Sequence, residues 1–179
     1  MILLEDSRQQ EGKHGQKHKY FEEHGIKVER TKLYVGDYTL PTNQSICIDS
    51  KKDLQEVVNN VCGAEHVRFR EECIRAKNAG IKLIILVEED QTDENGHYVV
   101  NDIRDVRKWQ NPRRQIRKKV NGQWVQAYPK ATTGLTLMKA MYTMQTRYDV
   151  EWKFCRKKDA GKKILELLGE ESNGSINEH

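Results

Sequence analysis

Several classes of protein are excluded by what this 179-residue sequence lacks. No apolar run approaches the ~20 residues that a membrane-spanning helix needs. The apolar residues 1–4 are followed at once by Glu5 and Asp6, so we do not expect a secretory signal. The four cysteines form no C-x-x-C pair and lie in apolar stretches, which favours buried free thiols in a reducing compartment. We therefore expect a soluble, cytoplasmic protein.

Apolar residues are scarce as well. They make up 36% of the chain, whereas charged residues make up 32%. A chain of this length can nevertheless bury the core of one domain. The composition is typical of an α/β domain with a heavily charged surface.

Acidic residues are absent from residues 106–148, a stretch that holds ten lysines and arginines. A block of one charge sign and of this length usually faces a polyanion, although a solvated loop is the alternative. Trp109, Trp124 and Tyr128 lie between these cations, and aromatic rings there could stack on bases while the cations neutralise phosphates. The candidate nucleic-acid-binding residues in the block are Arg113, Arg114, Arg117 and Lys118.

The hydrophobic pattern predicts strands and helices along the whole chain. Strands are expected at residues 1–6, 26–33, 45–49, 81–87 and 150–155, with another entered through a turn at 36–38. Helices are expected at residues 14–24, 54–61, 66–77, 133–147 and 160–168. The nearly all-apolar segment 81–87 predicts a central strand that is covered on both faces. This order predicts an α/β domain of three layers, with a central mixed sheet flanked by helices.

The domain is expected to span residues 1–169, with a basic insertion at about residues 90–131 and a disordered tail at 170–179. Within the insertion, Asn121-Gly122 predicts a small hairpin around residues 120–124.

Asp49 and Lys51 form the most informative polar pair, because side chains two apart on a strand point to the same face. Ile46 and Ile48 then take the core face. A carboxylate beside an ammonium at a strand end suits metal-assisted phosphodiester hydrolysis: the carboxylate binds Mg²⁺, and the lysine orients or deprotonates water and stabilises developing charge. A surface ion pair is the alternative, and the basic block downstream favours the nuclease interpretation.

A second carboxylate is needed to complete such a metal site. Asp37 lies on the preceding strand of a predicted hairpin, so we expect Asp37 and Asp49 to bind Mg²⁺ or Mn²⁺ together. Asp6, near the end of the first strand, could reach the same edge of the sheet and is a further catalytic candidate.

Three other charged residues are candidates with simpler alternatives. Arg8 shares a face with Asp6 and could contact a phosphate, or it forms a structural ion pair. Arg68 near the start of a helix could bind phosphate at the rim of the site, or it lies on a solvated helix face. Glu88 could reach the metal through a water molecule, or it is a solvated strand end.

These residues resemble the nuclease domain of the XPF-type structure-specific endonucleases, within the PD-(D/E)xK restriction-endonuclease-like superfamily. That family has Gly-Asp, a variable gap, Glu-Arg-Lys, three residues and Asp; here Gly36-Asp37 is followed after eleven residues by Asp49-Ser50-Lys51. Residues 6–9 are similar to the family's opening Asp-x-Arg-Glu, and residues 135–168 to its closing helix, strand and helix. The resemblance covers nearly all of residues 1–169.

The resemblance implies a metal-dependent endonuclease acting on branched, flap or junction DNA in repair or recombination, and a homodimer formed through the nuclease domain. The helix-hairpin-helix module that often follows is missing, as in small stand-alone versions from phages and prophages, so we expect the cytoplasm of a bacterium or phage-infected cell.

Asp-Ser-Lys replaces Glu-Arg-Lys, and Gln9 replaces a glutamate. Gln55 stands where the family has its last aspartate. Asp53 or Glu56 could substitute for that aspartate, or its role could be absent. Two alternative functions are a catalytically inactive DNA-binding module of the same fold and an RNA-binding protein that uses only the basic region.

Overall fold

The computed structural model describes residues 1–9 and 15–174 of the chain. Its main sheet has six strands in the order β2-β1-β3-β4-β5-β8. The bounds of these strands are β1 (Ile2–Asp6), β2 (Lys27–Thr31), β3 (Tyr38–Leu40), β4 (Asn43–Lys51), β5 (Lys82–Glu88) and β8 (Glu151–Cys155). Each corresponds to a strand expected from the sequence.

The sheet is mixed, as predicted. β1 and β2 are parallel, as are β4, β5 and β8, whereas β3 is antiparallel to both of its neighbours. The register places Asp49 beside Ile85 and Lys51 beside Val87 on β5. Because β4 and β5 run in the same direction, their carboxyl ends meet at one edge of the sheet.

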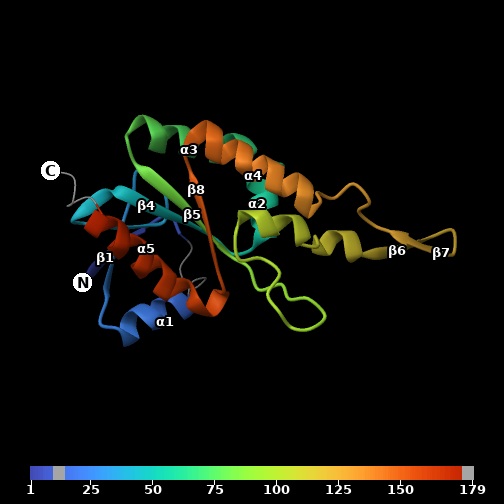
Figure 1. Cartoon of the computed structure of the whole chain (residues 1–179), viewed down its shortest axis with the longest axis horizontal. Helices are drawn as coiled ribbons and strands as arrows, with labels where there is room; N and C mark the ends of the chain where they lie inside the picture. The colour runs from blue at the N-terminus through green and yellow to red at the C-terminus, as the bar shows by residue number, and fades with distance from the viewer. Residues whose placement is uncertain (10–14, 175–179) are drawn as a thin grey trace.

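Helices cover both faces of the sheet, which confirms the three-layer α/β architecture (Figure 1). On one face lie α1 (Gly15–Glu23) and α5 (Ala160–Gly174), which pack on an apolar cluster that includes Ile48 and Ile84. On the other face lie α2 (Leu54–Val61), α3 (His66–Asn78) and α4 (Gly134–Tyr148), over a cluster that includes Leu83 and Ile85. The central strand β5 is therefore buried from both sides, as its apolar sequence predicts.

Strand β4 departs from the expected pattern of one core face and one open face. Ile46 and Ile48 are buried against the α1–α5 side, as predicted. On the opposite side, however, Cys47 belongs to the second core cluster, and Asp49 and Lys51 are only 3% and 7% exposed. The helices of the third layer cover this face, so the candidate catalytic pair is buried at a strand end and not displayed on the surface.

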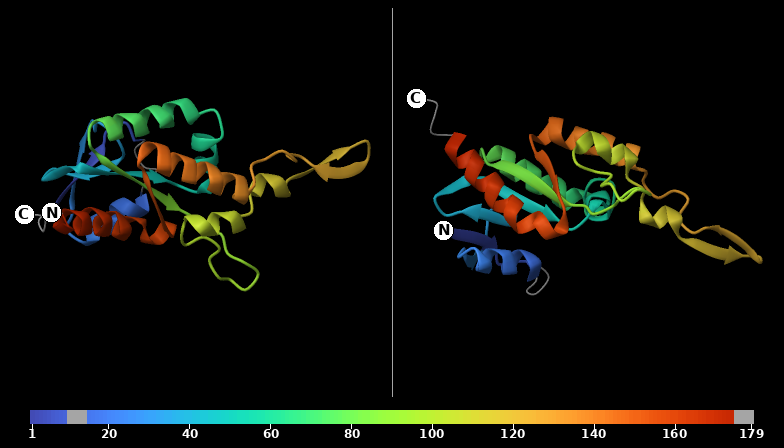
Figure 2. Two further views of the ribbon diagram at one scale, coloured as in Figure 1. Left: turned by 45° about the horizontal axis from the view of Figure 1, so that its top comes forward. Right: turned by 60° about the horizontal axis from the view of Figure 1, so that its bottom comes forward.

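The segment between β5 and α4 contains two short 3₁₀ helices, η1 (Ile103–Lys108) and η2 (Pro112–Gln115), and a hairpin of β6 (Arg117–Val120) and β7 (Gln123–Gln126). The hairpin confirms the predicted one, and positive φ angles at Asn121 (50°) and Gly122 (81°) fit a two-residue turn. It projects from the body of the domain (Figure 2). The insertion is not all peripheral, because Val100 and Val106 belong to the core.

Three further expectations can be compared with the structure. Helix α5 continues to Gly174, past the domain end expected at residue 169, while residues 175–179 of the expected tail lie outside the described residues. All four cysteines are free, and Cys47 and Cys73 are buried as expected; Cys155 is half-buried and Cys62 is exposed, so the expectation of a buried thiol is wrong for Cys62. Among the described residues, no helix combines the length and apolar character that crossing a membrane requires.

Candidate active site

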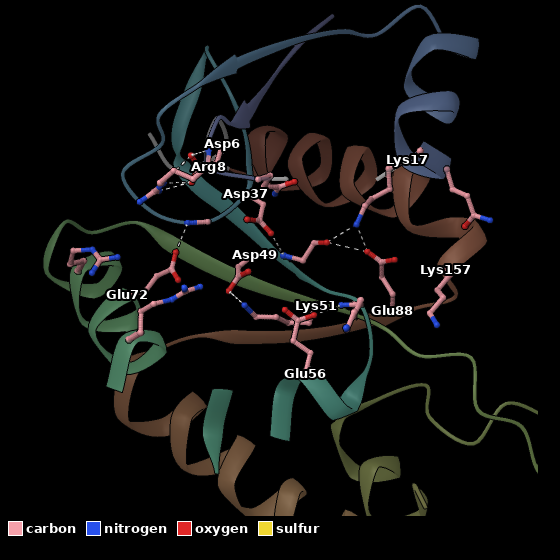
Figure 3. Close-up of a pocket in the computed structure, with 18 residues that line it drawn as sticks. Asp6, Arg8, Lys17, Asp37, Asp49, Lys51, Glu56, Glu72, Glu88 and Lys157 are labelled. Atoms are coloured by element: carbon pink, nitrogen blue, oxygen red, sulfur yellow. Dashed lines mark hydrogen bonds and ion pairs between the residues drawn. The ribbon is translucent and has the colours of Figure 1, made fainter. Parts of the chain in front are cut away.

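A cleft of about 1140 Å³ lies where β4 and β5 end, with contributions from α1, α2 and α3 (Figure 3). Its lining is strongly charged. The acidic residues are Asp6, Asp37, Asp49, Glu56, Glu72 and Glu88. The basic residues are Arg8, Lys17, Lys51, Lys52, Arg68, Arg75 and Lys157. The sequence-predicted residues Asp6, Arg8, Asp37, Asp49, Lys51 and Arg68 are thus brought into one cleft.

Asp49 and Lys51 form an ion pair at the carboxyl end of β4. Lys51 Nζ lies 2.8 Å from Asp49 Oδ2, and the ammonium group also lies over the ring of Phe69, 5.0 Å from its centroid. Burial alone would lower the pKa of Lys51, but the Asp49 and Asp37 carboxylates outweigh it and raise the pKa above its usual value. Lys51 is therefore held as a cation, which suits stabilisation of negative charge better than removal of a proton from water.

Asp37 lies in the turn that precedes β3 and not, as the sequence suggests, on the strand itself, and this turn places it beside the pair. Its backbone amide donates to the Ile48 carbonyl oxygen (2.7 Å), and its carboxylate Oδ2 accepts from the Ser50 amide (2.8 Å). Burial raises the pKa of Asp37 to about 8, and the neighbouring charge of Asp49 adds to this effect, although Lys51 and Ser50 oppose it. Because the charge of Asp49 disfavours ionisation of the Asp37 carboxyl, an added cation at this place would be stabilising.

These donors fit a hard divalent cation. Mg²⁺ usually keeps several waters and is bound in proteins through one or two carboxylates, which is what Asp37 and Asp49 offer. Within residues 1–9 and 15–174, no group of three or more His, Cys, Asp or Glu side chains is arranged to hold a metal ion. The two carboxylates that are present suit a cation that keeps most of its water ligands.

Asp6 lines the cleft, but its carboxylate is engaged by Arg8. The Arg8 Nε atom donates to Asp6 Oδ1 (3.0 Å) and Oδ2 (2.8 Å), and Nη2 donates to the Leu33 carbonyl oxygen (2.9 Å). Asp6 also donates its backbone amide to the Asp37 carbonyl oxygen (2.8 Å). Asp6 and Arg8 thus hold the Asp37 turn in place as well as lining the cleft.

Glu72 is a cleft residue that the sequence reasoning missed. Its Oε1 accepts from the Gly36 amide (2.9 Å), and burial together with the charge of Asp49 raises its pKa. A signal was present, because Glu72 lies at the edge of the buried stripe of α3 formed by Phe69, Cys73 and Ala76. An acid on the apolar face of a helix needs a partner or a function.

A second polar group lies on the α1 side of the same strand ends. Lys17 pairs with Glu88 and donates to Ser50 Oγ (2.7 Å), and Ser50 Oγ donates to Glu88 Oε1 (3.0 Å). Lys17 and Glu88 are both buried, so the interpretation of Glu88 as a solvated strand end is wrong. Lys17 was missed, although its position one turn before the buried Phe21 on α1 indicated an inward-facing lysine.

The residues considered as substitutes for the family's last aspartate differ in position. Asp53 is the N-cap of α2, where Oδ1 accepts from the Glu56 amide (2.7 Å). Glu56 lines the cleft and accepts from the Lys52 amide (2.9 Å). The side-chain amide of Gln55 is buried, and within the described residues neither its nitrogen nor its oxygen has a hydrogen-bond partner. Of the two acids, Glu56 is the one that faces the site.

The cations selected in the basic insertion do not line this cleft. Arg113, Arg117 and Lys118 are exposed, whereas Arg114 is half-buried and its Nη1 donates to the carbonyl oxygens of Pro129 (3.0 Å) and Ala131 (2.9 Å). Trp109 packs in the core, so the expectation that it could stack on bases is wrong.

The chain was compared with known proteins. The family model described as the ERCC4 domain matches residues 6–168. The structure of XPF from Aeropyrum pernix is similar over 96% of this chain, with a TM-score of 0.59 and 16% sequence identity. The structure of that XPF in complex with DNA is similar over 97%, with a TM-score of 0.57 and 16% identity. This chain spans 65% and 66% of those two chains, respectively. No curated protein matches the sequence. The two structures share the fold of this chain.

Proposed function

Because this chain belongs to the ERCC4 domain family, we propose that it is a metal-dependent DNA endonuclease that hydrolyses phosphodiester bonds in branched, flap or junction DNA. The observation that carries the proposal is the ion pair of Asp49 and Lys51 beside the buried carboxyl of Asp37. These groups lie in a cleft whose lining also carries exposed cations such as Lys52 and Arg68. A polyanionic substrate suits such a cleft, since basic side chains neutralise its phosphates.

Asp37 and Asp49 would hold the cation, either Mg²⁺ or Mn²⁺. When bound, the ion supplies Lewis-acid polarisation of the phosphate and lowers the pKa of a coordinated water. Lys51 keeps its positive charge next to Asp49, where it can stabilise negative charge that develops on the phosphate oxygens. Asp6 and Arg8 keep the Asp37 turn in position. Arg68 at the rim would contact phosphates away from the scissile bond.

The wider biology follows from the family resemblance. We include in the proposal a role in DNA repair or recombination, assembly as a homodimer through the nuclease domain, and residence in the cytoplasm of a bacterium or a phage-infected cell. DNA binding by exposed basic residues of the insertion, Arg113 and Arg117 among them, is part of the same proposal.

The proposal is tested with the substitution Asp49→Asn in a nicking assay on branched and linear DNA, with Mg²⁺, Mn²⁺ or EDTA. We expect the wild type to cleave branched DNA only with a divalent ion. The variant should lose cleavage and keep DNA affinity within a few fold, because one oxygen donor of the metal site becomes an amide. Asp53→Asn is the matched control, since asparagine retains the N-cap of α2 and should leave cleavage intact.

Three outcomes would contradict the proposal. Full activity of Asp49→Asn would show that Asp49 has no role in catalysis. Cleavage in the presence of EDTA would show that the reaction does not need a divalent ion. Binding of DNA without cleavage by the wild type under every ion would instead support an inactive DNA-binding module of the same fold.

A further inference from the structure

The β6–β7 hairpin is an exposed, charged element that the candidate active site does not use. It stands away from the body in every view (Figures 1 and 2), and none of its residues lines the cleft. Arg117, Lys118 and Lys119 give β6 three consecutive cations, and no acidic residue occurs between residues 106 and 148. None of these three cations forms an ion pair with a carboxylate in the described part of the chain.

The register of the hairpin separates its residues into two different faces. Arg117 pairs with Gln126 and Lys119 with Trp124, so these four side chains share one face. Lys118 pairs with Val125 and Val120 with Gln123, and these share the other face. One face therefore combines two cations with an aromatic ring, whereas the other has one cation beside two valines.

Trp124 is the exposed one of the three tryptophans. Its exposed fraction is 63%, whereas Trp109 and Trp152 are 4% and 6% exposed in the core. The Lys119 ammonium lies over the indole, 5.4 Å from the ring centroid, so one side of the ring is already covered by a cation. A ring with a cation on one side can lie with its other side against the sugars and edges of a groove while Lys119 and Arg117 contact phosphates.

The base of the hairpin is tied down, so the arm has a fixed direction. The Arg114 guanidinium binds two carbonyl oxygens of the returning segment, at Pro129 and Ala131, and Gln126 donates to the Arg114 carbonyl oxygen. Asn111 donates to the Thr132 carbonyl oxygen at 2.9 Å. An arm held in this way can meet a partner without first becoming ordered, which lowers the free-energy cost of binding.

We propose that the Arg117–Lys119–Trp124 face of the hairpin binds a DNA duplex arm that extends from the cleavage site. A two-stranded ribbon fits a duplex groove, and the charge of the face matches the phosphate backbone. The inference rests on the proposed nuclease function. Because the hairpin lies outside the cleft, the face contributes affinity for substrates with a long arm and takes no part in the chemistry.

The two neighbouring lysines of β6 provide a matched test. Lys119→Gln and Lys118→Gln remove the same charge from the same strand, but from opposite faces. Affinity for branched DNA is measured by fluorescence anisotropy in EDTA, with one duplex arm shortened stepwise. We expect Lys119→Gln to weaken binding several-fold on long arms and to reduce the log–log salt slope by ~0.9, as for the loss of one phosphate contact. Lys118→Gln should have little effect, and the difference between the variants should vanish on the shortest arms.

Trp124 supplies a second readout that does not depend on activity. Because it is the exposed tryptophan, acrylamide should quench its emission in the free protein, and long-armed DNA should protect it while short-armed DNA should not. Equal effects of the two lysine variants, or quenching unchanged by long-armed DNA, would overturn the assignment of this face.

Cleavage of a short-armed substrate by the wild type with Mg²⁺ separates the two proposals. If that cleavage is absent while long-armed DNA still binds the Lys119 face, the proposed nuclease function is wrong and the proposed binding surface is supported. If short-armed DNA is cleaved and the lysine variants do not differ, the surface fails alone.

Discussion

At the residue scale, the buried carboxyl of Asp37 determines how the site responds to pH. Its pKa is raised from 3.8 to about 8 in the folded protein. Folding therefore favours the protonated form of Asp37. The contribution of this group to the free energy of unfolding is fully present below pH 4, decreases as the pH rises, and is lost once the pH has passed 8. Each pH unit between the two pKa values contributes ~1.4 kcal/mol, which amounts to several kcal/mol over the window.

Asp37→Asn should consequently become more stable than the wild type as the pH rises. An asparagine can still accept from the Ser50 amide but cannot ionise. Without divalent ions, the melting temperatures of the two proteins should be similar near pH 4 and should diverge in favour of the variant as the pH rises to 9. Adding Mg²⁺ at pH 8 should raise the melting temperature of the wild type and leave that of the variant unchanged. A difference that does not depend on pH would show that Asp37 is ionised in the folded protein throughout.

Lys51 should act in the chemical step more than in binding, because its charge lies beside Asp49 and is almost fully buried. We expect Lys51→Met to lower the single-turnover cleavage rate by ~10²–10³, the range for the loss of one charge-stabilising group. Its affinity for DNA should change little.

Lys52 is the matched control, because it follows Lys51 directly in the chain but is exposed at the cleft. Lys52→Met should weaken binding and leave the single-turnover rate largely intact. The reverse pattern, with affinity lost in Lys51→Met and the rate retained, would make Lys51 a phosphate clamp.

At the element scale, the turn before β3 depends on Gly36. Its φ of +70° is left-handed, which costs other residues ~1–2 kcal/mol. A Cβ atom there would also lie 3.0 Å from the Ile48 carbonyl oxygen and 3.2 Å from Cys47 Cβ. The turn therefore packs directly on β4, and this close approach is what places the Asp37 carboxylate at the Ser50 amide.

Gly36→Ala should therefore destabilise the protein more than Gly25→Ala. Gly25 has a similar φ of +66°, but a Cβ atom there would meet nothing within 4 Å. In denaturant unfolding we expect Gly25→Ala to lose ~1–2 kcal/mol, from backbone strain alone. Gly36→Ala should lose more and should also cleave DNA more slowly. Equal losses of stability would mean that the turn can move away from β4 at no cost.

At the scale of the whole molecule, the cleft uses groups from both sides of the sheet. Asp49 and Lys51 lie on the side of α2 and α3, whereas Ser50 and Glu88 meet Lys17 on the side of α1. The Asp49–Lys51 pair and the Lys17–Ser50–Glu88 group line one cleft only because β4 and β5 end at the same edge of the sheet. The basic hairpin lies outside this cleft, so the surface proposed to hold a duplex arm is separated from the surface proposed to cleave it.

The sequence by itself determined the elements and the central pair of the site. Local periodicity is a property of consecutive residues, so it identified the strands and helices and the apolar character of β5. The same period of two placed Asp49 and Lys51 on one face, and the Gly-Asp turn pointed to Asp37. The hairpin was predictable from Asn121-Gly122 because the turn type depends on those two residues.

Only the tertiary structure decided which distant groups join them and how deeply they are buried. Glu72 and Lys17 come from helices on opposite faces of the sheet, and their partners Gly36 and Glu88 lie 36 and 71 residues away in the sequence. Likewise, Trp109 is buried in the core and Trp124 is exposed, although both lie in the same basic block. Such differences arise from packing between layers, a long-range effect that local sequence patterns do not encode.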